Sequence, residues 1–295
     1  MTETQRNDAL QLCEMGLQHM WRGEFDAAIG LYDRAAAAVE CDETRELITI
    51  RKAEALIAAE REGAEIGALP GIVMRRRSPR HVYIAASVLM RRFVESDDRR
   101  RAIFYGEIAR TAVAQFGEPL AQASVLNHLG NTLVADSQFA AAIKVLDEAV
   151  IALETCDPSR AEVRSLRPVV LGNLGGAHVL GGTAKKGIRI LESVLHDLDE
   201  EYNVIEAYLD LCFGYMEQER YDIAEMYGRR ALELATVKRQ VRNANHLMGE
   251  ICLRTDRYGE SDAYFDVVAG FYPDFKNVKQ LLVAVDLCAV VNWKA

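Results

Sequence analysis

The chain has 295 residues, of which 50% are apolar and 27% are charged, and its formal net charge is −9. This composition supplies enough apolar surface for a folded protein and excludes general disorder. Only six prolines occur in the whole chain, while residues that favour helix are plentiful. We therefore expect an all-helical protein, either compact or built as an elongated repeat array.

No segment has the pattern of a targeting signal or a membrane span. The first residues lack the charged start and apolar run of a secretory signal, and no apolar stretch approaches the roughly 18 residues that a bilayer requires. The cysteines form no CxxC pair, which is typical of reduced core residues in a reducing compartment; they are Cys13, Cys41, Cys156, Cys212, Cys252 and Cys288. We expect a cytoplasmic protein that does not associate with membranes.

Five segments of the sequence align on one another. In each, a small residue of a first helix is followed twelve positions later by a small residue of a second helix; the pairs are Gly16 and Ala28, Gly130 and Ala142, Gly175 and Gly187, Cys212 and Ala224, and Gly249 and Ser261. Two helices that cross closely need small side chains at their contact. The alignment predicts clear helical hairpins at 9–40, 121–155, 167–198, 203–236 and 240–273.

Two weaker copies fill the gap at about 43–117. The small position of each first helix then falls at 16, 53, 90, 130, 175, 212 and 249. The second helix of the copy near Ala53 should be poor, because GAEIGALPGIV holds three glycines and a proline. We expect a long loop near 63–80, a closing helix at 276–293, and one continuous domain over 1–295.

The repeat resembles the tetratricopeptide repeat (TPR) family. The first copy carries the family pattern best, and the last copy matches it at Met248, Gly249, Tyr258, Phe265 and Pro273; the matching residues of the first copy are Leu12, Met15, Gly16, Gly23, Phe25, Ala28, Tyr32 and Ala35. Ala184 and Cys212 depart from it. The resemblance implies an α-solenoid, a right-handed superhelix of about seven hairpins with a concave groove. Repeat steps of 37 to 45 exceed the family's usual 34, as in bacterial peptide-sensing regulators.

The resemblance also implies which residues line the groove, since the family places them on the first helix of each repeat. By register these are Arg91, Ser124, Asn127, Asn131, Asn173, Asn243, His246 and Glu250. An amide both donates and accepts hydrogen bonds, which suits a peptide backbone. Gly172 and Gly176 should leave a recess opposite Asn131. Equally, these amides could bond only to neighbouring helices or water.

A basic stretch at 75–110 interrupts the acidic chain, with ten arginines against four acidic residues. We name as a basic patch Arg75, Arg76, Arg77, Arg80, Arg92, Arg99, Arg100 and Arg101. The patch suits an acidic protein partner, or it is a solvated face. Nucleic acid is disfavoured, because interleaved aromatic residues are few and the whole chain is acidic.

No catalytic or metal-binding pattern emerges. GNLGGAHVLGG superficially resembles a phosphate loop, but no strand precedes it and no GK[ST] follows it. The six histidines lack the spacing of metal ligands. We expect no cofactor, no metal site and no enzymatic activity.

The last segment, 276–293, is apolar nearly all round from Leu281 to Val291. One face, near Leu282, Val285 and Ala289, can cover the seventh hairpin, but Leu281, Val283 and Val290 cannot share that face. A terminal helix of an array usually keeps a polar outer side. The pattern predicts a homodimer through this helix.

These observations favour a non-catalytic scaffold that binds a peptide or a helix of another protein in its groove. One alternative is a regulator of a signalling or transcription partner that responds to a peptide or another ligand. A second alternative is a nucleic-acid-associated accessory protein that acts through the basic stretch.

Overall fold

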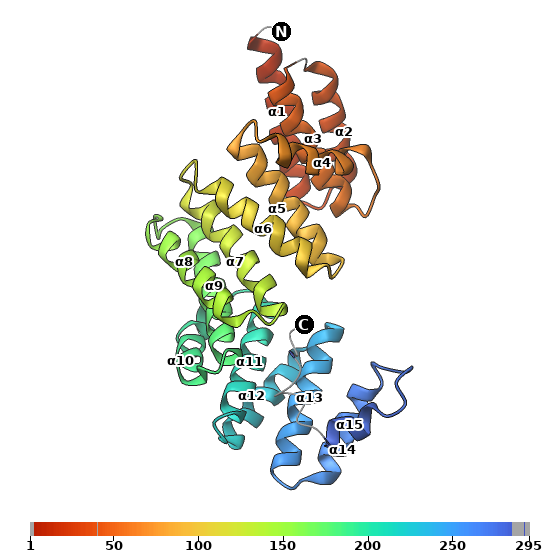
Figure 1. Cartoon of the computed structure of the whole chain (residues 1–295), viewed down its shortest axis with the longest axis vertical. Coiled ribbons are helices and arrows are strands. Elements are labelled where there is room, and N and C mark those ends of the chain that lie inside the picture. The colour runs from red at the N-terminus through yellow and green to blue at the C-terminus, as the bar shows by residue number, and fades with distance from the viewer. Residues whose placement is uncertain (1–2, 40, 285–291, 293–295) are drawn as a thin grey trace. The chain divides into compact units, whose positions relative to one another are not determined.

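The computed structural model describes residues 3–39, 41–284 and 292, and within these ranges it contains α-helices and one short 3-10 helix but no strand. Fourteen of the α-helices pair in chain order into seven hairpins, and α15 (Val278–Ala284) follows the last of them (Figure 1). The hairpins are α1 (Glu3–Trp21) with α2 (Phe25–Ala38), α3 (Asp42–Ala58) with α4 (Ala64–Arg75), α5 (Pro79–Glu95) with α6 (Arg99–Val113), α7 (Pro119–Ala135) with α8 (Phe139–Glu154), α9 (Ala161–Leu180) with α10 (Ala184–Val194), α11 (Glu201–Met216) with α12 (Tyr221–Leu234), and α13 (Lys238–Arg254) with α14 (Tyr258–Ala269). The all-α array of seven hairpins is confirmed.

The chain divides into two compact units, Met1–Val125 and Leu126–Ala295. The first unit contains α1 to α6 and the start of α7, and the second contains the remainder. The single continuous domain over 1–295 stays a prediction.

The hairpin turns repeat with the register of the small residues. Each turn places one residue in the left-handed region, namely Gly23, Glu60, Asp97, Ser137, Gly182, Glu219 and Asp256. Each of these lies seven positions after the small residue of its own first helix, in the two weak copies as well. A left-handed residue stops a right-handed helix and lets the chain reverse. The same local geometry therefore closes all seven hairpins.

The small residues permit close helix crossings, as the alignment predicted. A Cβ on Gly249 would lie 2.4 Å from Cε1 of Phe265, and the Ser261 hydroxyl donates a hydrogen bond to the Gly249 carbonyl oxygen over 2.9 Å. A Cβ on Gly187 would lie 2.4 Å from the carbonyl oxygen of Gly175. A larger side chain at these positions would push the two helices apart.

The segment expected to be a loop at 63–80 is instead mostly helix α4, so that prediction is wrong. Ile66, Leu69, Ile72 and Val73 are all buried on one side of α4, against the apolar core of the first unit. Their burial outweighs the poor helix propensity of the glycines and of Pro70, which lies inside the helix. Tertiary packing overrides local preference here.

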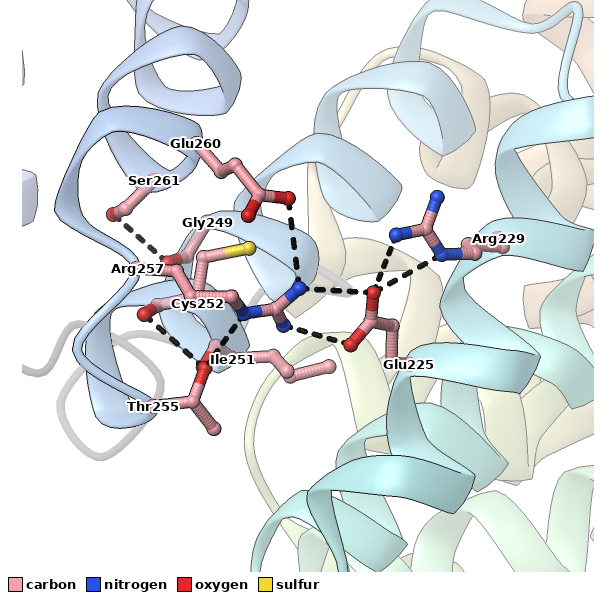
Figure 2. Close-up of polar contacts among 9 residues, drawn as sticks. All are labelled: Glu225, Arg229, Gly249, Ile251, Cys252, Thr255, Arg257, Glu260 and Ser261. Carbon is pink, nitrogen blue, oxygen red and sulfur yellow. Dashed lines mark hydrogen bonds and ion pairs between the residues drawn. The ribbon is translucent and has the colours of Figure 1, made fainter.

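An ion-pair network ties the sixth hairpin to the seventh. Figure 2 shows the Arg257 guanidinium between Glu225 of α12 and Glu260 of α14. Its two terminal nitrogens donate to both carboxylate oxygens of Glu225, over 2.7 and 3.1 Å, and its Nε donates to the Thr255 hydroxyl over 3.0 Å. Arg229 donates to the same Glu225 carboxylate from within α12. Bidentate geometry fixes both distance and orientation between neighbouring hairpins.

The closing helix α15 packs on the seventh hairpin through Leu282. Leu282 is buried against Phe265 and Val268 of α14, as expected for the covered face. Leu281 and Val283 remain 40% and 48% exposed. Val285, Ala289 and the rest of the predicted helix up to 291 lie outside the described residues.

The described cysteines are all free thiols. Cys13, Cys212 and Cys252 are buried in the apolar cores, as the sequence predicted, whereas Cys41 and Cys156 are partly exposed. Burial raises the pKa of the Cys13 thiol to about 11, so the thiol stays protonated at neutral pH.

Candidate functional site

The second unit buries polar side chains mainly on the first helices of its hairpins. We call this set the polar row; it consists of Asn127 and Thr132 on α7, His178 on α9, Asp210 on α11, and Gln240, Asn243, Asn245 and Glu250 on α13. Burying an amide or a carboxylate is costly unless hydrogen bonds replace those to water. Each member therefore needs a partner or another reason to be there.

Three members have structural partners within their own hairpin. The Thr132 hydroxyl donates to the His128 carbonyl, and the Asn245 amide donates to the Val241 carbonyl, each one turn back along its helix. His178 Nδ1 lies 2.8 Å from the Thr183 hydroxyl in the turn that follows. Burial lowers the pKa of His178, which favours the neutral ring. These bonds account for the burial of Thr132 and Asn245, whereas Nε2 of His178 has no hydrogen-bond partner among the described residues.

An amide pair links the fourth and fifth hairpins. The Asn173 side chain donates to Oδ1 of Asn127 over 2.8 Å; Asn127 is buried, and Asn173 is partly exposed. Asn131, one turn further along α7, is exposed. A Cβ on Gly172 would meet nothing within 4 Å, so space is open beside Asn173. An amide next to open space is available to a ligand backbone.

Glu206 of α11 is the centre of the contacts at the start of α13. Its carboxylate accepts hydrogen bonds from Arg239 over 2.9 Å and from the Gln240 amide over 3.0 Å. The Gln240 amide also donates to the Tyr202 carbonyl oxygen over 3.2 Å. These bonds hold the first turn of α13 against α11.

Further along α13, polar side chains follow one another at helical spacing. The side-chain Oδ1 of Asn243 accepts two hydrogen bonds from Arg242, at 3.0 and 3.1 Å. Nε2 of His246 lies 3.7 Å from Glu250 Oε1, and Arg254 Nε lies 3.9 Å from Glu250 Oε2. Both distances are longer than a hydrogen bond, so Glu250 is held only by longer-range attraction.

Two buried acceptors of α13 have no hydrogen-bond partner in the part of the chain that the structure describes. They are Oε1 of Gln240 and Oε1 of Glu250, and both side chains are about 1% exposed. A buried acceptor without a donor costs roughly 1–3 kcal/mol. Native proteins contain few such groups, and each calls for an explanation.

No family model matches this sequence, and no curated protein sequence matches it significantly. Solved structures do match it. A Rap protein complexed with competence and sporulation factor aligns over 96% of this chain and 79% of its own, with a TM-score of 0.64 at 14% identity. NprR in complex with its cognate peptide NprX aligns over 97% and 84%, with a TM-score of 0.67 at 12% identity.

A tetratricopeptide repeat protein from Parabacteroides merdae aligns over 94% of this chain and 98% of its own, with a TM-score of 0.55 at 11% identity. The chain folds as a TPR-type array. At these identities the likeness establishes the fold alone, which is the fold that the repeat pattern predicted.

Five of the eight predicted groove residues of this TPR-type array fall into two groups. Asn127 and Asn173 contact each other, and Asn243, His246 and Glu250 follow one another along α13. Arg91 lies in the first unit, where it pairs with Glu54. Ser124 also lies in the first unit and is partly buried. The role of all these residues in binding stays a prediction.

Most arginines of the basic patch are paired within the first unit. Arg75 contacts buried Glu46 at 3.2 Å and Arg77 contacts Asp42 at 3.3 Å. The other pairs are Arg80 with Glu118, Arg99 with Asp97, and Arg101 with Asp98. The patch is therefore less positive than its sequence suggests, because Glu46 and Asp42 of α3 and Glu118 before α7 compensate three of its arginines.

Sequence reasoning missed Asp210, Gln240 and Glu46. Each is a buried polar residue in the structure, but an isolated Asp, Gln or Glu in a helix usually lies on the solvent side. All three lie on the first helix of their hairpins, but only the structure shows that they are buried. Glu46 is buried because its partners Arg75 and His81 come from elsewhere in the chain.

In the ranges that the structure describes, no group of three or more His, Cys, Asp or Glu residues is arranged to hold a metal ion. Nor is any helix among the described residues long and apolar enough to cross a membrane.

Proposed function

We propose that this TPR-type array is a non-catalytic interaction scaffold that binds a peptide, or a helix of another protein, on the polar row of its second unit. The observation that carries the proposal is the pair of buried acceptors on α13, Gln240 Oε1 and Glu250 Oε1, which lack donors in the described chain. An extended peptide supplies N–H donors at regular spacing along its backbone. Ten residues of helix separate the two acceptors, about 15 Å at 1.5 Å per residue.

The amide pair supports the same site. Asn131 is exposed and Asn173 partly exposed, beside the open space at Gly172. The Rap and NprR structures that share this fold are complexes with competence and sporulation factor and with the peptide NprX, respectively. Peptide binding is therefore compatible with the fold.

A specific observation favours a second candidate, a regulator that changes conformation when a peptide binds. Gln240 and Glu250 are buried, so a ligand reaches their oxygens only if neighbouring groups move. Binding that requires a rearrangement shifts the population between two states of the array. The partner that reads this change would be a separate signalling or transcription protein.

The remaining proposals concern location and assembly. We place the protein in the cytoplasm, and we propose a homodimer through α15, because Leu281 and Val283 present apolar surface beside buried Leu282. Light scattering at micromolar concentration tests the dimer: the mass of a monomer contradicts it. Nucleic acid gains no support, because ion pairs occupy most of the patch arginines.

Peptide display against the full chain tests the main proposal. Random 12-residue peptides are selected, and each binder is titrated against Asn131→Ala and against Glu250→Met, which removes the acceptor oxygen. We expect both variants to weaken binding about tenfold, the loss of roughly one hydrogen bond to a peptide. The matched control is Asn203→Ala, which removes an amide that bonds to Glu200 in the first turn of α11. Peptides that bind both site variants as tightly as the wild type contradict the proposal.

A further inference from the structure

A cavity of about 450 Å³ opens on the third hairpin, entirely within the first unit. Its walls come from the end of α4, the first turn of α5 and one face of α6. On α6, Phe104, Glu107, Ile108 and Thr111 contribute at spacings of three and four residues, so they share one side of the helix. The volume falls in the range of natural ligand pockets, about 300–1,000 Å³.

The larger part of the cavity lining is apolar. Val82 and Ala112 form buried parts of its lining, at 6% and 3% exposure, and Pro79 and Ile108 add aliphatic surface. Phe104 is 56% exposed although its ring meets Tyr105 edge-on, with 5.1 Å between ring centroids. An aromatic ring left half in water beside an apolar hollow is a common feature of protein docking sites.

One arginine at the rim differs from its neighbours. Arg75, Arg77 and Arg80 each contact an acid of another helix or turn, whereas Arg76 makes no ion pair or hydrogen bond among the described side chains. Arg76 is exposed and ends α4 in the left-handed region, with φ of 51°. This backbone is uncommon for a side chain without a local hydrogen bond.

The charge at the rim therefore favours an anionic group. Glu107, the acid that lines the cavity, already pairs with Arg110 at 3.3 Å. The Arg76 guanidinium retains its full donor capacity, and a guanidinium binds a carboxylate through two parallel hydrogen bonds. A suitable occupant combines a large apolar side chain with a carboxylate a short distance away.

We propose that this cavity docks an acidic amphipathic helix from a partner protein. The helix inserts one Leu or Phe side chain between Val82 and Phe104, and a Glu or Asp three or four positions along pairs with Arg76. Residues at that spacing lie about 5–6 Å apart on one helix face. This inference does not depend on the proposed function, because the cavity and the polar row belong to different units.

A displayed library of 16-residue helical peptides, randomised on one face, tests the proposal with the full chain as target. We expect selected sequences to pair a large apolar residue with an acid at a spacing of three or four. Fluorescence anisotropy then compares variants. Phe104→Ala should weaken these peptides about tenfold and Arg76→Gln about fivefold, which are typical effects of truncating an interface anchor and an ion pair.

The matched controls remove a positive charge and an exposed apolar side chain at positions outside the cavity. Arg100→Gln takes one exposed charge from the same basic patch, and Ile151→Ala removes a side chain that is 61% exposed on α8. Both should stay within about twofold of the wild type. Circular dichroism checks that Phe104→Ala stays folded. Arg76→Gln, at an exposed position, tests peptide binding independently of that variant. Selected peptides without the apolar–acid spacing, or unchanged binding to both cavity variants, overturn the proposal.

Discussion

The two units differ in how closely their buried carboxylates are paired. In the first unit, buried and half-buried charges have partners: Glu46 contacts Arg75 and His81, and Glu54 contacts Arg51 and Arg91. In the second unit, α13 carries the buried acceptors of Gln240 and Glu250, for which no described donor exists. The hydroxyls of Tyr32 and Ser87 in the first unit also lack a hydrogen-bond partner among the described residues, so the difference between the units concerns the buried carboxylates: those of the first unit have close cationic partners, and Glu250 of the second has only distant ones.

The difference separates stability from binding. A saturated ion pair adds little net stability but becomes expensive when one partner is removed, because the other charge is left behind. An unsaturated acceptor already carries its cost in the folded state, so removing it lowers the cost. Substitutions in the first unit should therefore destabilise, and substitutions in the polar row should mainly alter binding.

The largest expected effect is in the first unit. Glu54→Ala leaves Arg51 and Arg91 facing each other without the carboxylate, whose side chain is 18% exposed. We expect a loss of about 2 kcal/mol, below the range for fully buried pairs because Arg91 is half exposed. Urea unfolding followed by amide hydrogen exchange of α3 and α5 measures it. Glu95→Ala, at an exposed position of α5, is the control and should change little.

Lowering the pH should also destabilise the first unit. Burial alone would raise the pKa of Glu54, but the charges of Arg91 and Arg51 and their hydrogen bonds outweigh it and hold the pKa below its usual 4.5. A hydrogen bond from Lys52 likewise lowers the pKa of Glu65. A depressed folded pKa gives stability that is present above pH 4.5 and is lost as pH falls through the folded pKa.

The measurement is the free energy of unfolding of the first unit between pH 6 and pH 3. The double variant Glu54→Gln and Glu65→Gln should flatten this dependence, because neither amide titrates. An unchanged slope would show that other carboxylates control the acid response.

A smaller effect of opposite sign is expected in the second unit. Glu250→Met replaces a buried carboxylate by an apolar side chain of similar length and should raise stability by about 1 kcal/mol. The same variant should lose peptide binding. Thermal unfolding and titration with a selected peptide give the two readings. Destabilisation would mean that the weak contacts with His246 and Arg254 stabilise the helix. It would contradict the view that the buried Glu250 carboxylate costs stability in the second unit.

The smallest expected change in stability comes from replacing either of two glycines by alanine. Gly67 in α4 and Gly172 in α9 both have open space where a Cβ would lie. Alanine at either position should add about 0.5–1 kcal/mol, because alanine is the better helix former. Only Gly172→Ala should also weaken peptide binding, since its methyl group fills the space beside Asn173. Equal effects on binding would place the peptide elsewhere.

Local spacings in the sequence were sufficient to predict the positions of the hairpins. A small residue followed by another twelve positions later predicted the crossing in each of the five clear hairpins, and Gly249 with Ser261 shows why: the contact leaves no room for a larger side chain. The resemblance placed Asn127 and Asn173 in the groove; their side chains contact each other, and their role in binding stays a prediction. The loop at 63–80 failed, because glycine and proline content describes the isolated segment and not the core that covers α4.

The sequence by itself determined the all-helical class, the seven hairpins and the register of their first helices, since these depend on spacings within about forty residues. Only the tertiary structure decided which charges are compensated. Arg91 meets Glu54 and Arg75 meets Glu46 across helices 37 and 29 positions apart in the chain. Such pairs follow from how helices pack in space, and a single sequence carries no local signal for them. The isolation of Arg76 and the unmatched acceptor of Glu250 became visible for the same reason.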